Sequence, residues 1–272
     1  AAVTVGTPRI TDAGYWAEEA RTNLLLNTAT LSTQSVTVTA VAHTLSFYGT
    51  GTVTLTGTST AGPLVGTGAS NRVALTFTPT AGTLTLTVTG SVTIAQLEAG
   101  SFATSPIPTT SVAVTRAADV GYVSGIAIPT TGTMVATANV PVTAVDQYFA
   151  FASDGTLANR VQVGSQATNG QGGSVIYTAS AGANPIATGL AAGGIKTVGL
   201  AYAPGAQAIS ASGSAIVTAS AASVPTVTRF DVGGGGAAVS GRQANGAIRR
   251  IIIYPRAFGN SELQAITTAG AY

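Results

Sequence analysis

A regular alternation of threonine with aliphatic residues limits the fold of this chain more than any other feature of its sequence. The stretches SVTVTAV, TVTLTG and TLTLTVTG place Val or Leu at alternate positions, and Gly, Ser or Pro residues separate such stretches. Successive side chains of a β-strand point to opposite faces of its sheet, so this pattern predicts strands with one buried and one exposed face. Thr suits the exposed face because its β-branched side chain fits the pleat without adding charge.

The turn residues recur at roughly 8 to 12 residues, a spacing typical of β-sandwiches of Greek-key or jelly-roll type. The alternation lapses between Gly100 and Arg116, where two prolines and many Ser and Thr residues indicate a domain boundary. We therefore predict an all-β protein with two antiparallel β-sandwich (jelly-roll) domains in tandem and a short C-terminal helix. The predicted segments are an N-terminal docking segment at 1–22, a sandwich at 23–105, a linker at 106–120 and a second sandwich at 121–272.

The C-terminal stretch AIRRIIIYP carries apolar residues on both faces of a strand, which predicts a central strand that Pro255 ends. The following SELQAITT predicts a short helix capped by Asn260 or Ser261, with Glu262 in its first turn. Leu263 and Ile266 have the spacing that places both on one helix face, against the sandwich. We interpret this segment as a closing strand and helical clasp, in preference to a ligand site formed by its arginines.

Composition excludes several classes of function. The 272 residues include 11 Lys and Arg against 9 Asp and Glu, so no basic surface for nucleic acid is expected. No apolar run reaches the ~18 residues of a membrane span, and we expect a soluble protein. The absence of Cys excludes disulfides and thiolate metal sites. Because the sequence begins at Ala1 without Met, we expect a processed or excised part of a longer protein.

Catalytic groups are scarce, and we predict that the protein is not an enzyme. A glycosidase needs two carboxylates opposed across a cleft. Five of the nine carboxylates have predicted structural roles: Glu18, Glu19, Glu98, Asp119 and Glu262. Of the other four, Asp146, Asp154 and Asp231 are the loop or strand-end carboxylates that leave a calcium site as the one alternative to our prediction of no cofactor. His43 has no second His or Cys at ligand spacing and is predicted to be a strand residue.

Sugar binding requires less: an aromatic ring on which a pyranose stacks, and a few amides or carboxylates for its hydroxyls. The predicted glycan-binding residues are Tyr48, Tyr148 with Asp146 close by in the sequence, and Tyr202. Tyr15 and Trp16 are further aromatic candidates, although Trp16 is interpreted first as an anchor for the N-terminal segment. Ordinary packing is the alternative for each ring.

Two parts of the sequence resemble known families. The run TPRITD, EEARTNLLLNT and AQLEAGSFATSPIPTTSVAVTRAADV resembles tailed-phage and prophage virion proteins, chiefly head-fibre, spike and tail-fibre proteins. In those proteins the part between EARTNLL and QLEAG is a carbohydrate-binding-module-like sandwich, which the resemblance implies for 23–105.

The second resemblance covers the C-terminal part. NGAIRRIIIYPRAF followed by SELQAI resembles the last strand and clasp of concanavalin A-like, laminin-G-type jelly rolls. GIKTVGLAYAPGAQAISASG resembles the preceding hairpin, although Thr197 and Val198 stand where that family often has a Trp. The resemblance implies such a domain at 121–272.

Together the resemblances imply a protein on the surface of a virion that attaches weakly and multivalently to host-surface polysaccharide. Its expected partners are other capsid or tail proteins, that polysaccharide, and further copies of itself, with a trimer favoured. Two alternatives stay open: a structural capsid or tail decoration without a ligand, and, as a weaker one, a polysaccharide depolymerase.

Overall fold

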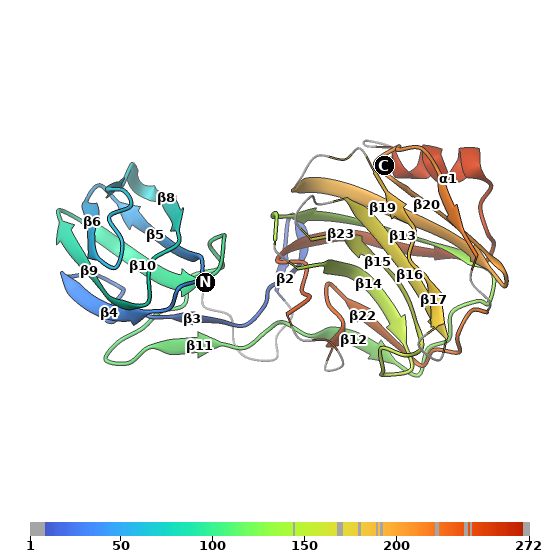
Figure 1. Cartoon of the computed structure of the whole chain (residues 1–272), viewed down its shortest axis with the longest axis horizontal. Helices are drawn as coiled ribbons and strands as arrows, with labels where there is room; N and C mark the ends of the chain where they lie inside the picture. Colours follow the sequence, from blue (N-terminus) through green and yellow to red (C-terminus); the bar gives the residue numbers. More distant parts are fainter. Residues whose placement is uncertain are drawn as a thin grey trace. The chain divides into compact units, whose positions relative to one another are not determined.

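The computed structural model describes residues 9–143, 145–167, 171–178, 181–188, 190, 193–220, 223–236, 239 and 241–268. The chain forms two compact units: Ala20–Ala117 make the first, and the described residues of 9–19 and 118–268 make the second. Antiparallel strands dominate both units, and a single short helix lies near the C-terminal end of the described part (Figure 1). The predicted all-β class with two sandwiches and a C-terminal helix is confirmed.

The first unit consists of two main sheets that enclose one core. One sheet has the order β4 (Gln34–Val38), β9 (Gly82–Thr89), β6 (Thr52–Gly57), β7 (Leu64–Val65). The other has the order β10 (Val92–Ala99), β5 (His43–Gly49), β8 (Gly68–Phe77). A further pair joins β3 (Arg21–Asn23) to β11 (Val114–Arg116). Both main sheets contribute fully buried side chains, among them Leu45, Phe47, Leu84, Leu86 and Leu97.

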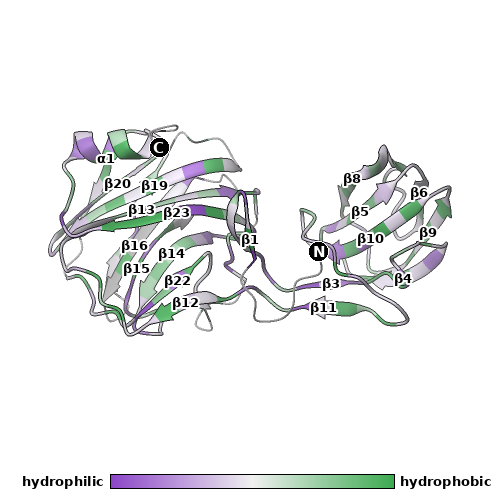
Figure 2. Cartoon of the chain, turned by 180° about the vertical axis from the view of Figure 1, so that it is seen from behind, coloured by the Kyte–Doolittle hydropathy of each residue, from purple (hydrophilic) through white to green (hydrophobic). Residues whose placement is uncertain are grey.

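The threonine alternation produces the predicted two-faced strands. In β6, Val53 and Leu55 are buried while Thr54 and Thr56 are exposed. Thr54 lies opposite Thr87 of β9, so threonines form cross-strand pairs on the outer face. Figure 2 shows the alternation as hydrophobic and paler bands along the strands of the first unit. This outer face carries hydroxyls and almost no charge, as the sequence indicated.

The second unit is a larger sandwich of two seven-stranded sheets. The first sheet has the order β1 (Ile10–Thr11), β2 (Gly14–Ala17), β23 (Gly246–Tyr254), β13 (Gly132–Val140), β19 (Gly194–Ala203), β20 (Ala206–Ala211), β21 (Val217–Ala219). The second has the order β12 (Gly121–Ser124), β22 (Arg229–Val232), β14 (Gln147–Ser153), β15 (Arg160–Ser165), β16 (Gly172–Thr178), β17 (Ala181–Ala183), and β18 (Ile186–Ala187) also pairs with β16. Side chains from both sheets fill the space between them, among them Met134, Phe149, Ile176, Val198 and Leu200.

The predicted clasp is present. Strand β23 pairs with β2 on one side and β13 on the other, so it is central, as predicted. Helix α1 (Asn260–Thr267) buries Leu263 and Ile266 in a small separate core with Val135 and Ala201, on the outer face of the first sheet. The predicted cap was wrong: Gly259 occupies the N-cap position with extended backbone, and no side chain bonds there. No described helix is long and apolar enough to cross a membrane.

In the sequence, the first unit lies between two segments that both belong to the second unit. Residues 9–19, which lie within the predicted docking segment, supply β1 and β2 to the second unit before the chain enters the first. On its return, Asp119 donates its backbone N–H to the carbonyl of Glu18 (2.8 Å), and Glu18 donates to Oδ2 of Asp119 (2.9 Å). Residues 114–116, within the predicted linker, form β11 of the first unit. The docking role of 1–22 stays a prediction.

Candidate functional site

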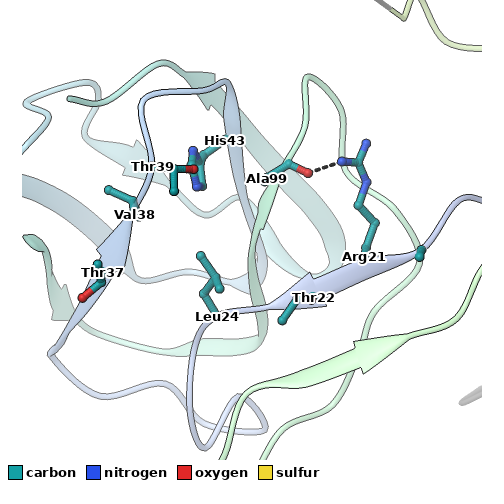
Figure 3. A pocket seen from close by; sticks show the side chains of 9 residues that line it. Arg21, Thr22, Leu24, Thr37, Val38, Thr39, His43 and Ala99 are labelled. Atoms are coloured by element: carbon teal, nitrogen blue, oxygen red, sulfur yellow. Dashed lines mark hydrogen bonds between the residues drawn. The ribbon is translucent and has the colours of Figure 1, made fainter. Parts of the chain in front are cut away.

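The first unit contains a hollow of about 390 Å³, which we call the threonine hollow (Figure 3). It lies where β3, the end of β4, the start of β5 and the end of β10 meet. Its lining consists of Ala20, Arg21, Thr22, Leu24, Thr37, Val38, Thr39, His43 and Ala99. A volume in the range of roughly 300–1,000 Å³ is typical of small-molecule sites.

The hollow combines an apolar base with hydroxyl groups. Val38 is buried in the core of the first unit, and the half-buried Leu24 packs against that core. Thr37 and Thr39 flank Val38 on the exposed face, and no described residue bonds their hydroxyls. Thr22 shares a hydrogen bond with Thr115 (Oγ1 to Oγ1, 2.7 Å), which fixes its side chain. Hydroxyls that both donate and accept suit a ligand that itself carries hydroxyls.

His43 adds an oriented imidazole to the lining. Its Nδ1 lies 2.8 Å from the carbonyl oxygen of Val41, and because a carbonyl only accepts, Nδ1 carries the proton. In the neutral ring Nε2 is therefore a hydrogen-bond acceptor. The ring also stacks near Phe77, with centroids 6.4 Å apart, and the residue is almost fully buried. His43 begins β5, so the predicted strand position is confirmed.

Arg21 places a fixed positive charge at the rim of the hollow. Its guanidinium donates to the carbonyl of Ala99 and lies 3.7 Å from Oε2 of the buried Glu98 (Nε to Oε2). Glu98 in turn accepts hydrogen bonds from the backbone N–H of Thr104 (2.8 Å), its hydroxyl (2.6 Å) and Nε2 of Gln96 (2.7 Å). The carboxylate is thus fully engaged in holding the rim, the structural role predicted for Glu98.

No carboxylate is among the described residues that line the threonine hollow. A hydrolase of the usual kind needs an acid and a second carboxylate at the scissile bond. The lining offers an apolar base, hydroxyls, one imidazole and one guanidinium, a set that can bind a polyhydroxy ligand but supplies no such pair.

Two of the predicted glycan-binding residues, Tyr48 and Tyr202, do not line the threonine hollow. Tyr48 is half-buried on β5 and is not part of the threonine hollow. Tyr202 is only 1% exposed, within the core of the second unit, and burial raises the pKa of its phenol to about 12. A ring enclosed on both faces has no surface for stacking, so the structure corrects the prediction for Tyr202. The sequence carried a signal for this, because Tyr202 continues the alternation of Val198 and Leu200, which are buried.

The structure brings Asp146 and Tyr148 together at a small hollow of about 20 Å³ in the second unit. Tyr148 is 7% exposed and stacks on Phe151, with centroids 5.4 Å apart and planes at 15°. Asp146 accepts from the backbone N–H of Ala167 (2.9 Å) and lies 3.5 Å from Arg242 (Oδ2 to Nη1). A space of this size holds a water molecule and no pyranose ring. A glycan role for these residues stays a prediction.

The three carboxylates considered for calcium are each occupied by neighbours. Asp154 accepts from Thr156 and Asn159, which lower its pKa. Asp231 is paired with Arg229 (2.6 Å, Nη2 to Oδ1). Among the described residues, no group of three or more His, Cys, Asp or Glu side chains is placed to hold a metal ion.

The residues of the threonine hollow were not among the predicted sites. Thr37 and Thr39 belong to the stretch SVTVTAV, whose alternation predicts their exposed face but not which other segments meet there. The missing information is long-range, because β3 and the end of β10 reach the hollow from positions far away in the sequence.

No protein-family model matches this sequence, and no curated protein matches it. Among solved structures, the Ruminococcus gnavus IT-sialidase CBM40 is similar at 17% identity, with a TM-score of 0.44, over 55% of this chain and 97% of that chain. The same module bound to alpha2,3 sialyllactose gives 16% identity and a TM-score of 0.45, over 55% of this chain and 96% of that chain. The heptameric SAP-like pentraxin from Limulus polyphemus gives 10% and 0.42, over 56% of this chain and 76% of that chain. Similarity at this level transfers no ligand or activity to this chain.

Proposed function

We propose that this protein binds glycans and that the threonine hollow of its first unit is a binding site. The observation that carries the proposal is the composition of the hollow: threonine hydroxyls and a guanidinium surround an apolar base beside the nearly buried His43, and the described lining residues include no carboxylate. Sugars combine hydroxyls with apolar ring faces, so they match such a surface. An open site of this kind binds a single sugar weakly, and several copies raise the avidity.

We further propose that the protein acts on a virion surface, as a head-fibre, spike or tail-fibre protein that attaches to host polysaccharide. The support is the sequence resemblance of the EARTNLL and QLEAG stretches. The structure explains why these stretches suit one sandwich: Asn23, fully buried, donates to the carbonyls of Ala95 (3.0 Å) and Ile107 (2.8 Å) and accepts from the N–H groups of Leu25 (3.2 Å) and Leu97 (3.1 Å). Asn23 thus joins the two stretches within the fold, and the same stretches also supply Arg21, Thr22 and Ala99 to the lining of the threonine hollow.

Binding of fluorescently labelled protein to host cells, before and after periodate oxidation of their sugars, tests the function. We expect binding that oxidation abolishes. The matched pair of variants is Thr37→Lys in the hollow and Thr56→Lys on the exposed face of β6, outside it. Thr37→Lys should weaken binding about tenfold or more by filling the hollow, and Thr56→Lys should leave it unchanged.

Each other outcome has a clear meaning. Equal binding by both variants would remove the hollow as the site. No binding by folded wild-type protein to either cell sample, with firm retention on particles, would favour a structural decoration. Release of reducing ends from host polysaccharide would establish a depolymerase and overturn the non-enzymatic function.

A further inference from the structure

The second unit contains a separate hollow of about 330 Å³ at its C-terminal clasp. We call it the clasp hollow; its lining residues are Tyr254, Arg256, Phe258, Glu262, Ala265 and Ile266. All six come from the end of β23, the connecting loop and α1. None of them was a predicted glycan-binding residue, since this segment was interpreted as a structural clasp.

A two-bond ion pair lies at the hollow. Arg256 donates from Nη1 to Oε2 of Glu262 (2.8 Å) and from Nη2 to Oε1. The two side chains are 59% and 42% exposed. The pairing raises the pKa of Arg256 and lowers the pKa of Glu262, so both groups are charged at neutral pH. An exposed ion pair of this kind contributes little to the stability of the fold.

Contacts with Thr133 and Phe258 hold the ion pair in place. The hydroxyl of Thr133 donates to the carbonyl of Arg256 (2.9 Å) and accepts from the N–H of Phe258 (2.9 Å), which fixes the loop on β13. The guanidinium lies 4.3 Å from the ring centroid of the buried Phe258. Phe258 also contacts the ring of Tyr254, with centroids 4.7 Å apart. A site fixed before binding loses less entropy when a ligand arrives.

The pair leaves hydrogen-bonding capacity for a ligand. A guanidinium has five N–H donors, and Glu262 takes two of them; each carboxylate oxygen also retains acceptor capacity. Two neighbouring hydroxyls of a sugar can donate to the carboxylate and accept from the guanidinium at the same time. The half-buried Tyr254 borders the same hollow and supplies an aromatic surface.

We propose that the clasp hollow binds a neutral pyranoside, with neighbouring hydroxyls bridging Arg256 and Glu262 and the sugar's apolar face against Tyr254. The preference for a neutral sugar follows from the charges. The pair has no net charge, and an acidic sugar would have to displace Glu262 from Arg256 while lying beside its carboxylate. The site is independent of the threonine hollow, so either can exist without the other.

Saturation-transfer NMR and calorimetric titration of the full chain test the proposal. The probes are the methyl glycosides of glucose, galactose and mannose, with the methyl glycoside of N-acetylneuraminic acid as the acidic comparison. We expect at least one neutral probe to bind, with contacts to the Tyr254 ring, and Arg256→Ala or Glu262→Ala to weaken it about tenfold or more. Ser261→Ala, an exposed change in the same helical turn outside the lining, should leave binding unchanged.

The variants alter exposed side chains, and thermal unfolding verifies that each remains folded. No binding of any neutral probe to wild-type protein would overturn the proposal, as would a preference for the acidic probe. Binding that survives Arg256→Ala and Glu262→Ala but disappears in Thr37→Lys would also overturn it, because the sugar would then occupy the threonine hollow. Conversely, sugar binding at the clasp without any attachment to host cells would sustain this site while the proposed attachment function fails.

Discussion

Tyr202 illustrates how an enclosed residue affects stability in a pH-dependent way. Its hydroxyl is buried and has no hydrogen-bond partner among the described residues. Burial disfavours the phenolate, which raises the pKa from 10.0 to about 12. Between these two values the folded state keeps a proton that the unfolded state loses. The free energy of unfolding contributed by this group therefore falls as the pH rises through that window.

Replacing the tyrosine by phenylalanine should remove this dependence. Tyr202→Phe deletes a buried hydroxyl without a partner, so the variant should be as stable as wild type or more stable at neutral pH. At a pH between the two pKa values it should exceed wild type by a larger margin. Chemical denaturation at both pH values measures this, with Tyr48→Phe in the first unit as the control. A variant clearly less stable than wild type at neutral pH would contradict the explanation.

At the scale of elements, the sequence predicted what depends on local pattern. The alternating strands, the central β23 and the docked face of α1 were predictable because each follows from side-chain periodicity. Strands β1 and β2 were not, since Trp16 pairs with Ala247, far away in the sequence, and Gly14 has a positive φ of +119°. The threonine hollow has the same origin: its residue types were visible, but the meeting of distant segments was not.

The docking of α1 depends on one glycine of the sheet below it. A Cβ on Gly199 would lie 2.7 Å from Cγ2 of Thr267 and 2.9 Å from Cδ1 of Leu263, both buried. Gly199→Ala should therefore displace the helix and destabilise the second unit by about 1–3 kcal/mol. Relative to wild type, amide hydrogen exchange in the Gly199→Ala variant should accelerate more in α1 than in β13 or β14.

The matched control for this change is Gly173→Ala in the opposite sheet. There a Cβ would meet the flexible side chain of Gln166 at 3.0 Å, so the cost should be small. Unaltered exchange in α1 of the Gly199 variant would show that the helix accommodates the methyl group, and the packing argument would be wrong.

At the scale of the whole molecule, the main feature is that the first unit begins and ends at neighbouring residues. Glu18 and Asp119 exchange two hydrogen bonds in the second unit, and β3 pairs with β11 in the first. Each unit also has its own core. Each unit can therefore complete its own sheets and core without strands from the other. The predicted tandem order did not anticipate that the first unit lies between two parts of the second in the sequence.

Removal of Ala20–Ala117, with a short Gly-Ser linker in its place, should leave the second unit folded. The linker only has to join two points that are already adjacent, so its closure costs little entropy. Trp16, the sole tryptophan, lies in the second unit, and its fluorescence reports unfolding there. Its transition should match that of the full chain within about 1 kcal/mol. A shortened chain without a cooperative transition would show that the units depend on each other.

The two connections between the units, near Glu18 and Asp119, also matter for the evolution of such a protein. A single recombination event with breakpoints at the two connections exchanges the whole first sandwich, together with its hollow, as one cassette. The β-sheets, the clasp and any contacts of the second unit pass through such an exchange intact. Variation in the surface of the first unit can thus arise without any change in the fold of the second.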